Sequence, residues 1–176
     1  DLVAPLPNAL FNEGLVPALK TGLLLSRDLF VLLEEEDPRQ HWEKILVLNL
    51  LCKKHLMEED EAATAQQRLL DYGKLVGHAV LAQLGPGTMP YGAATGLGLL
   101  PFIENKGLLR RTRALLKKWG LPVKLPCPAG EIFPFLPITP ARAGARYTLP
   151  RVKTLGHGHL ETITREAQGL QITDWD

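Results

Sequence analysis

Histidine and cysteine are the residues most able to bind metals or act as nucleophiles, and in this chain they are few and scattered. Cys52 and Cys127 lie far apart and outside any Cys-x-x-Cys pattern, so a cysteine-based zinc site is not expected. Four of the five histidines form no recognised zinc-ligand spacing, namely His41, His55, His157 and His159. The pattern predicts that His157 and His159 lie in an ordinary glycine-rich loop.

A second candidate for chemistry is the glycine-rich segment Gly92-x-x-x-Gly96-x-Gly98. It falls on a helical pattern and does not follow a predicted strand, so it does not match the dinucleotide-binding fingerprint. The segment predicts instead a helix with small side chains on one face, against which another backbone can pack closely. We therefore expect that this chain alone binds no NAD.

Basic residues are the remaining candidates, and each has a plain structural interpretation. Lys20 and Lys53 are consistent with solvated lysines at helix ends, and His78 with a core histidine satisfied by backbone atoms. A basic run lies on one predicted helix and comprises Arg110, Arg111, Arg113, Lys117 and Lys118. Such a run is typical of a solvated amphipathic face, and less often of a contact with a partner or RNA.

Composition narrows the class of protein. The 176 residues suit one domain spanning 1–176, or two small ones, and 45% hydrophobic residues can form a core without disulfides. A formal net charge of +1 gives no field that attracts nucleic acid or an anionic membrane. The longest apolar runs are too short to cross a bilayer. Two unpaired cysteines fit a reducing compartment, so we expect a cytoplasmic protein.

The first half of the chain predicts helices. Residues 8–36 show apolar positions at helical spacing, typical of two helices, with Pro17 either opening or kinking the first and Ser26 capping the second. The leucine-rich row from Gln40 to Met57 predicts a buried helix. Residues 59–84 are helical in composition, but the glycines predict a break or close packing near Tyr72–Gly73.

The second half of the chain predicts a further helix followed by strands. Leu108 to Trp119 predicts an amphipathic helix that stops at Gly120 and Pro122. Residues 147–152 and 161–164 have strand-like content and flank a glycine-rich segment, which predicts a small hairpin. The expected fold class is therefore mainly α, a multi-helix bundle with a β-hairpin near the C-terminus. The proline-rich opening residues also resemble a linker from an upstream segment.

Three segments, in order, resemble the C-terminal domain of the 3-dehydroquinate synthase-like, or sugar-phosphate cyclase, family. Residues 14–22, Gly-Leu-Val-Pro-Ala-Leu-Lys-Thr-Gly, are similar to the family's Gly-Leu-Ala-Glu helix. Residues 69–79, Leu-Leu-Asp-Tyr-Gly-Lys-Leu-Val-Gly-His-Ala, are similar to its Gly-His-Thr-x-Gly-His segment. Residues 89–98, beginning Met-Pro-Tyr-Gly, are similar to its His-Gly-Glu helix. The resemblance implies the fold and relates the chain to a zinc- and NAD-dependent lyase of the shikimate pathway type.

The resemblance also implies a zinc site built from one glutamate and two histidines, and this chain departs from it at every ligand position. Pro17 stands at the glutamate, Lys74 at the first histidine and Tyr91 at the second. Proline has no donor atom, a protonated lysine repels a dication, and neutral tyrosine is a poor zinc ligand. The alignment therefore predicts that zinc is absent and that no residue serves as a metal ligand.

Other family positions are better retained. Lys20 and Lys53 match basic residues that hold the anionic end of the substrate, and His78 matches a substrate-contacting histidine. Arg142 falls near a basic pair of the family. The resemblance thus makes these four residues candidates for binding a small anion, with no catalytic residue assigned. Asp71 stands at an asparagine of the family. Lys74 could pair with it or with another carboxylate in the vacated pocket, or it could be an exposed lysine.

These implications leave three hypotheses. In the first, the chain is a catalytically inactive structural or regulatory homologue that pairs with its own upstream NAD-binding domain, or a separate one, in a homo- or heterodimer. In the second, it is the substrate-binding half of a divergent NAD-dependent cyclase, so NAD would enter only with that other domain. In the third, it is an all-helical interaction module without an anion pocket at Lys20 and Lys53. Turnover by the full-length protein separates the first two.

Overall fold

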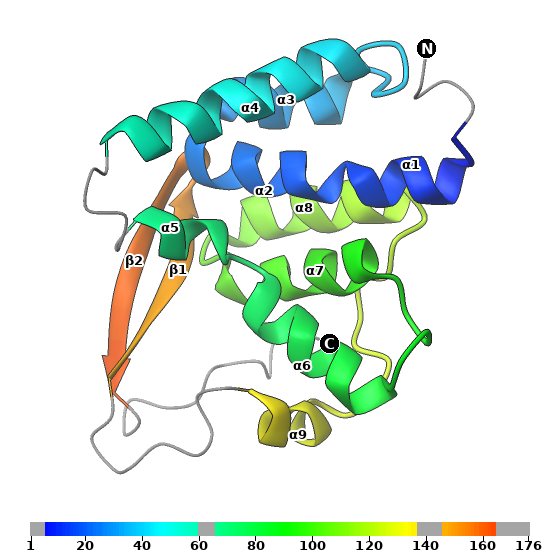
Figure 1. The fold of residues 1–176 in the computed structure, drawn as a ribbon, viewed down its shortest axis with the longest axis vertical. Helices are drawn as coiled ribbons and strands as arrows, with labels where there is room; N and C mark the ends of the chain where they lie inside the picture. Colours follow the sequence, from blue (N-terminus) through cyan, green and yellow to red (C-terminus); the bar gives the residue numbers. More distant parts are fainter. Residues whose placement is uncertain (1–5, 60–65, 137–145, 165–176) are drawn as a thin grey trace.

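The computed structural model describes residues 6–59, 66–136 and 146–164, and the fold is mainly helical with a small hairpin near the C-terminus, as predicted. The long helices lie in layers, with α3 and α4 over α1 and α2, then α7 and α6, and the hairpin along one side (Figure 1). The elements are α1 Asn8–Gly14, α2 Val16–Leu25, α3 Arg27–Glu35, α4 Trp42–Glu59, α5 Gln66–Leu70, α6 Lys74–Leu84, α7 Tyr91–Leu99, α8 Lys106–Lys118, α9 Ala129–Ile132, β1 Arg146–Thr154 and β2 His157–Thr164, with 3-10 turns at Leu100–Phe102 and Phe133–Phe135.

The first helical segment holds three helices where two were predicted. Pro17 lies in the first turn of α2, where its missing N–H leaves no helical bond unmade, so it opens this helix and does not kink one. The Ser26 hydroxyl accepts a hydrogen bond from the Leu29 N–H, which confirms the predicted cap of α3. The proline thus explains the additional boundary, after Gly14.

The helix α4 is present as predicted, but the prediction that it is buried was wrong. Only one side of it packs on α2 and α3, through residues such as Ile45, Asn49 and Leu56. The opposite side carries Leu46, Leu50 and Leu51, whose side chains are 46–55% exposed. Leucine content alone does not say which face of a helix has a neighbour, so the sequence overstated the burial.

The glycines of α6 and α7 allow the two helices to touch through their backbones. The predicted break is confirmed: Gly73 has φ 82°, a left-handed conformation that favours glycine, and α6 begins at the next residue. A Cβ added at Gly98 would collide with the Gly73 carbonyl oxygen, and one added at Gly77 would lie 2.9 Å from the Ala94 oxygen. These contacts confirm the close approach that the small residues of α7 predicted.

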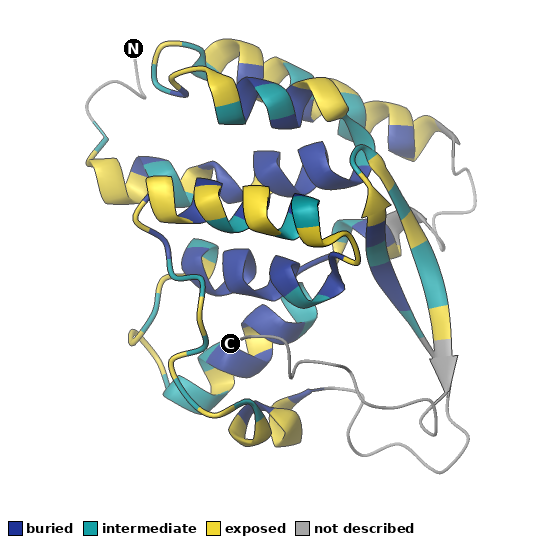
Figure 2. Ribbon diagram, turned by 180° about the vertical axis from the view of Figure 1, so that it is seen from behind, coloured by how far each residue is buried: buried dark blue, intermediate teal, exposed yellow. Residues whose placement is uncertain are grey.

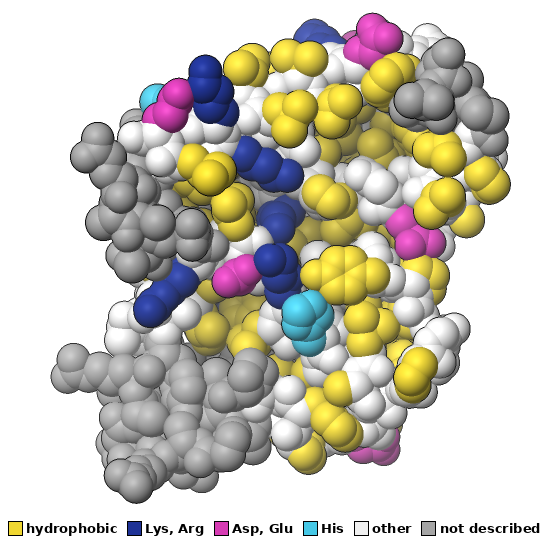
Figure 3. Space-filling model, viewed as in Figure 1, with side chains coloured by type: hydrophobic (Ala, Val, Ile, Leu, Met, Phe, Trp, Pro, Cys, Tyr) yellow, Lys and Arg dark blue, Asp and Glu magenta, His cyan; other side chains and the backbone are white. Residues whose placement is uncertain are grey.

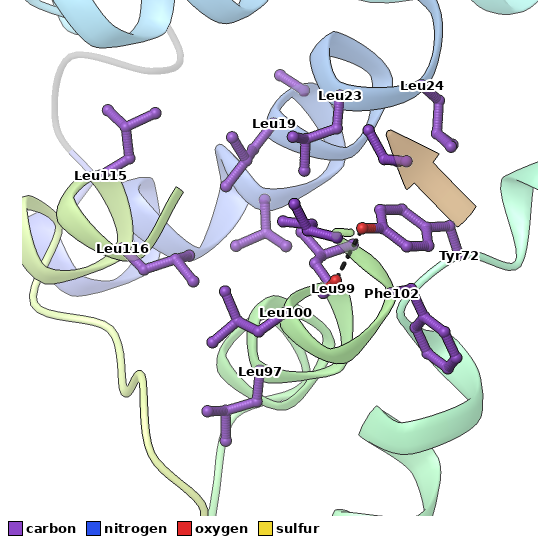
Figure 4. Packing of buried hydrophobic residues seen from close by; sticks show 14 of the residues in the cluster. Leu19, Leu23, Leu24, Tyr72, Leu97, Leu99, Leu100, Phe102, Leu115 and Leu116 are labelled. Carbon is purple, nitrogen blue, oxygen red and sulfur yellow. Dashed lines mark hydrogen bonds between the residues drawn. The ribbon is translucent and has the colours of Figure 1, made fainter. Parts of the chain in front are cut away.

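The core fills the space between α2, α7, α8 and the hairpin, where most residues are buried (Figure 2). Figure 4 shows leucines of α2, α7 and α8 around Tyr72, whose hydroxyl donates a 2.7 Å hydrogen bond to the Leu99 carbonyl oxygen. Complete burial raises the pKa of this phenol well above its ordinary value. Tyr72 therefore joins the α5–α6 turn to the end of α7.

The amphipathic basic helix was also predicted correctly. The Asn105 side chain accepts from the N–H groups of Gly107 and Leu108 at the start of α8, and Gly120, with φ 71°, follows its end. Arg111 makes a bidentate contact with Glu34 of α3, with N–O distances of 2.9 and 2.6 Å. Among the described helices, none is both long and apolar enough to cross a membrane.

The hairpin is antiparallel, with Arg151 opposite His159, and its turn is shorter than predicted. The prediction that His157 and His159 lie in a loop was wrong, because both belong to β2 and the turn is Leu155–Gly156. The Gly156 N–H donates to the Leu23 carbonyl oxygen at 3.0 Å. This bond attaches the hairpin tip to α2.

Candidate functional site

A cavity of about 420 Å³ opens where the first turns of three helices meet. We call it the Lys20 pocket, and it is lined by Leu10, Glu13, Gly14, Val16, Pro17, Lys20, Lys74, Tyr91, Gly92 and Thr95. Figure 3 shows basic side chains in a row at the centre of this face, beside a histidine and between apolar side chains. The pocket therefore combines mostly apolar walls with concentrated positive charge.

The structure brings together the three positions at which the family resemblance places zinc ligands. Pro17 comes from the first turn of α2, Lys74 is the first residue of α6, and Tyr91 is the first residue of α7. Helix N-termini carry partial positive charge from their unpaired N–H groups. The helix ends thus reinforce the charge of the lysines, and together they favour an anion over a cation.

Lys20 is the most enclosed charge of the pocket. It lies within α2 with only 9% of its surface exposed, so the expectation of a solvated lysine at a helix end was wrong. Its Nζ donates a 2.6 Å hydrogen bond to the Leu70 carbonyl oxygen at the end of α5. Burial first, then the nearby charges of Lys74 and Lys53, lower its pKa from 10.5 to about 8, against a smaller opposing effect of Asp71.

Lys53 approaches the same region from α4. It follows Asn49 by one helical turn, and Asn49 Oδ1 accepts a 2.6 Å hydrogen bond from the Thr21 hydroxyl of α2, which fixes this face of α4 against α2. Lys53 is half-buried, and burial lowers its pKa. The positive charge of Lys53 contributes to lowering the pKa of Lys20, although Lys53 is not among the residues that line the pocket.

Lys74 differs from Lys20 in having an acidic partner. Its Nζ lies 2.8 Å from Asp71 Oδ1, so of the alternatives left open for Lys74 the structure shows the pair with Asp71. The hydrogen bond with Asp71 raises the pKa of Lys74, whereas that of Lys20 is lowered. Lys74 is therefore held as an ammonium ion, and Lys20 is biased towards the neutral amine.

His78 lies at the rim and is exposed, so the prediction of a core histidine satisfied by backbone was wrong. Its Nε2 is 3.3 Å from the Tyr91 hydroxyl, and the two rings are 5.7 Å apart between centroids. The face of α6 that carries His78 points away from the core, which the Gly77–Ala79 context did not reveal. Arg142 lies outside the described residues.

The donors present do not suit a metal. Within residues 6–59, 66–136 and 146–164, no three His, Cys, Asp or Glu side chains gather as a possible metal site. Glu13 is the pocket's carboxylate among these residues, and it shares the cavity with two lysines. A zinc ion needs several deprotonated nitrogen, sulfur or oxygen donors, and the side chains at the three mapped positions do not provide them.

Comparison with known proteins identifies the family of the chain. A model of the family described as 3-dehydroquinate synthase C-terminal matches residues 14–136, which is more than half of the chain. The chain belongs to this family. The 3-dehydroquinate synthase of Clostridium perfringens (strain SM101) is 29% identical over 133 residues, covering 69% of this chain and 38% of the relative. That of Dictyoglomus turgidum is 26% identical over 176 residues, covering 92% of the chain.

Two solved structures share the fold of this chain. The 2-epi-5-epi-valiolone synthase of Streptomyces hygroscopicus, with NAD+ and Zn2+ bound, has a TM-score of 0.71 and 17% identity, covering 96% of this chain and 50% of that one. A 2-deoxy-scyllo-inosose synthase complexed with carbaglucose-6-phosphate, NAD+ and Co2+ has a TM-score of 0.69 and 16% identity, with 92% and 51% covered. The chain thus spans about half or less of the length of these proteins.

Some pocket residues of this family member were missed by sequence reasoning. Thr95 lies one turn after Tyr91 in α7, so helical spacing from Tyr91 could have placed it on the pocket wall. Its hydroxyl is buried without a hydrogen-bond partner among the described residues. Glu13 and the Leu70 carbonyl carried no such signal, because their positions depend on how α1 and α5 pack.

Replacing Lys20 with methionine should stabilise the fold near pH 7 by about 1–2 kcal/mol. Because the folded-state pKa of Lys20 is lowered to about 8, its ammonium opposes folding at lower pH. Native stability should rise between pH 8 and 10.5, where the unfolded chain alone still binds the proton. Urea unfolding across this range tests the rise, which the variant should lack.

The exposed Lys44 of α4 provides the matched control, since Lys44→Met removes a charge that is not buried. The control should keep the rise in unfolding free energy. A Lys20→Met variant whose stability difference from the native chain stays constant from neutral to alkaline pH would contradict the assigned environment of Lys20.

Proposed function

We propose that this chain is a 3-dehydroquinate synthase-like domain that has exchanged its zinc site for an anion-binding pocket and acts as a structural or regulatory homologue. The observation that carries the proposal is the meeting of Pro17, Lys74 and Tyr91 in one cavity. They are the positions that the family resemblance assigns to the metal, and their chemistry does not suit zinc. Catalysis of the zinc-dependent reaction is therefore not expected.

The charge of the pocket supports an anion as its ligand. Lys20 and Lys74 line the cavity, Lys53 adds a positive charge near Lys20, and residues from the first turns of α2, α6 and α7 line the cavity too, where helix N-termini carry partial positive charge. Glu13 lines the same cavity, and an anion would bind beside the lysines because they attract it and a carboxylate repels it. The proposed ligand is a small carboxylate or phosphate, small enough for a cavity of about 420 Å³.

The alternative is the substrate-binding half of a divergent NAD-dependent sugar-phosphate cyclase. It is favoured by the retention of Lys20, Lys53 and His78 at positions where the family holds substrate, and by a chain that spans half or less of its relatives. NAD would then come with a second domain, upstream or separate, in a homo- or heterodimer. Turnover of a sugar phosphate by the full-length protein distinguishes this alternative from an inactive homologue.

The zinc content of the purified chain tests the proposal first. After mild dialysis at neutral pH, elemental analysis should find less than roughly 0.1 zinc per chain, even after zinc is added and excess removed. Stoichiometric zinc would overturn the proposal and place the cyclase alternative first. His78 and one of His55, His157 or His159 would then be the ligands to test by substitution.

A further inference from the structure

Two lysines in the same pocket have opposite environments. Lys20 is nine-tenths buried, and its recorded partner among the described residues is a neutral carbonyl oxygen, that of Leu70, at 2.6 Å. Lys74 bonds to a carboxylate, that of Asp71, at 2.8 Å. Titratable groups whose environments diverge in this way are typical of sites where one group reacts and the other stays charged.

We propose that Lys20 is a nucleophilic amine that condenses with a small anionic aldehyde or ketone to form an imine, while the Lys74 ammonium holds the anionic group of that compound. The inference rests on the anion-binding part of the proposed function and adds the carbonyl group as a second recognition element. A lysine becomes a nucleophile when it is desolvated in an apolar pocket beside other cations. The walls formed by Leu10, Val16 and Pro17 provide the apolar surroundings.

The titratable groups near Lys20 come from several elements. Most of them either disfavour its ammonium form or are bonded to another residue. Lys74 from α6 and Lys53 from α4 both disfavour its ammonium form. Asp71 favours the ammonium form but is bonded to Lys74. Tyr91 from α7 contacts His78, and Glu13 from α1 also lines the cavity. The result is a pKa of about 8, which leaves a substantial neutral fraction at physiological pH.

The covalent step balances without a further reagent. The lone pair of neutral Nζ attacks the carbonyl carbon and forms a C–N bond, and the former carbonyl oxygen takes a proton. Loss of water breaks the C–O bond while the nitrogen lone pair forms C=N, and the second N–H proton passes to solvent. The sum is amine plus carbonyl compound giving imine plus water, with no change of oxidation state.

The test is to trap the imine with glyoxylate, a small carboxylate that carries an aldehyde. The chain is incubated with glyoxylate and sodium cyanoborohydride, whose hydride reduces the imine to a stable carboxymethyl amine, and labelled peptides are quantified by mass spectrometry. Lys20 should be labelled at least about tenfold faster than the exposed Lys44 and Lys117 near pH 7.5, because its neutral fraction is far larger. Its rate should level off above pH 8, whereas theirs should keep rising.

Variants of Lys74 separate reactivity from folding. Lys74→Met removes a cation that lowers the pKa of Lys20 and also the partner for the carboxylate, so Lys20 labelling should fall at least about fivefold. Lys74→Arg retains the charge and should keep most of the rate. Labelling of Lys20 no faster than that of Lys44, or a rate unchanged in Lys74→Met, would overturn the inference.

Phosphate calorimetry on the same preparation distinguishes failure of the inference from failure of the proposed function. Saturable phosphate binding without selective Lys20 labelling would overturn the amine chemistry and leave the anion pocket in place. Selective labelling without phosphate binding, and without protection by acetate, would instead overturn the anion site and the assigned role of Lys74.

Discussion

A variant carrying Pro17→Glu, Lys74→His and Tyr91→His should bind about one zinc ion per chain, where the native chain is expected to bind none. The three side chains already line one cavity, so the substitutions place a carboxylate and two imidazoles around a common space. Lys74→His also removes an ammonium ion that repels a dication. Elemental analysis after dialysis and competition with a chromophoric chelator measure the content and the affinity.

The substitutions themselves should be tolerated. Glutamate is favourable in the first turn of α2, where Pro17 now lies, because it faces the positive end of the helix dipole. Loss of the Lys74–Asp71 pair costs little, since both side chains are substantially exposed and exposed pairs contribute less than about 1 kcal/mol. Zinc should then raise the melting temperature of the variant and leave that of the native chain unchanged.

A matched control keeps Pro17 and carries Lys74→His and Tyr91→His alone. With two of the three ligands it should bind zinc at least about tenfold more weakly, since each side chain that binds the metal contributes strongly to affinity. A folded triple variant that stays free of zinc would show that the three positions do not form the family's metal site in this chain. The proposed exchange of a zinc site for an anion pocket would then lose its basis.

Gly98→Ala should destabilise the fold by more than about 3 kcal/mol, or prevent folding. The added Cβ would collide with the Gly73 carbonyl oxygen and lie 2.9 Å from the Gly77 nitrogen. Backbone atoms of two packed helices cannot move aside as a flexible side chain can, so α6 and α7 would have to separate. Urea unfolding followed by circular dichroism measures the loss.

Gly14→Ala is the control for the helix-forming tendency of alanine. No atom lies within 4 Å of the Cβ that it would add at the end of α1, so it should change stability by at most about 1 kcal/mol, towards greater stability. Comparable stability of the Gly98 and Gly14 variants would mean that the contact between α6 and α7 is looser than described.

Sequence reasoning succeeded where local chemistry decides the structure. Ser26, Gly73 and Gly120 each specify a backbone boundary through a capping hydroxyl or a positive φ, and each of these boundaries was predicted, whereas Pro17 was expected either to open or to kink a helix and opens one. The small residues of α7 predicted close packing for the same reason. These features depend on a few neighbouring residues, so a single sequence contains the information.

Sequence reasoning failed where the burial of a residue depends on which elements pack together. Leu50 and Leu51 are exposed because the described part of the chain places no element over that face of α4, and Lys20 is buried because α2 is covered by several helices. The gathering of Pro17, Lys74 and Tyr91 was expected from the family resemblance and from no spacing within the sequence. The lowered pKa of Lys20 could not be anticipated without its three-dimensional neighbours.

The backbone contact between α6 and α7 has a consequence for how this domain can diverge. Its key positions, Gly77 and Gly98, lie further along the helices than Lys74 and Tyr91, whose side chains reach the pocket. Substitutions at Lys74 and Tyr91 can therefore change the chemistry of the pocket without changing the glycines at which the two helices touch. The side chains that line the pocket can thus be replaced during evolution while the backbone contact between α6 and α7 that positions them is kept.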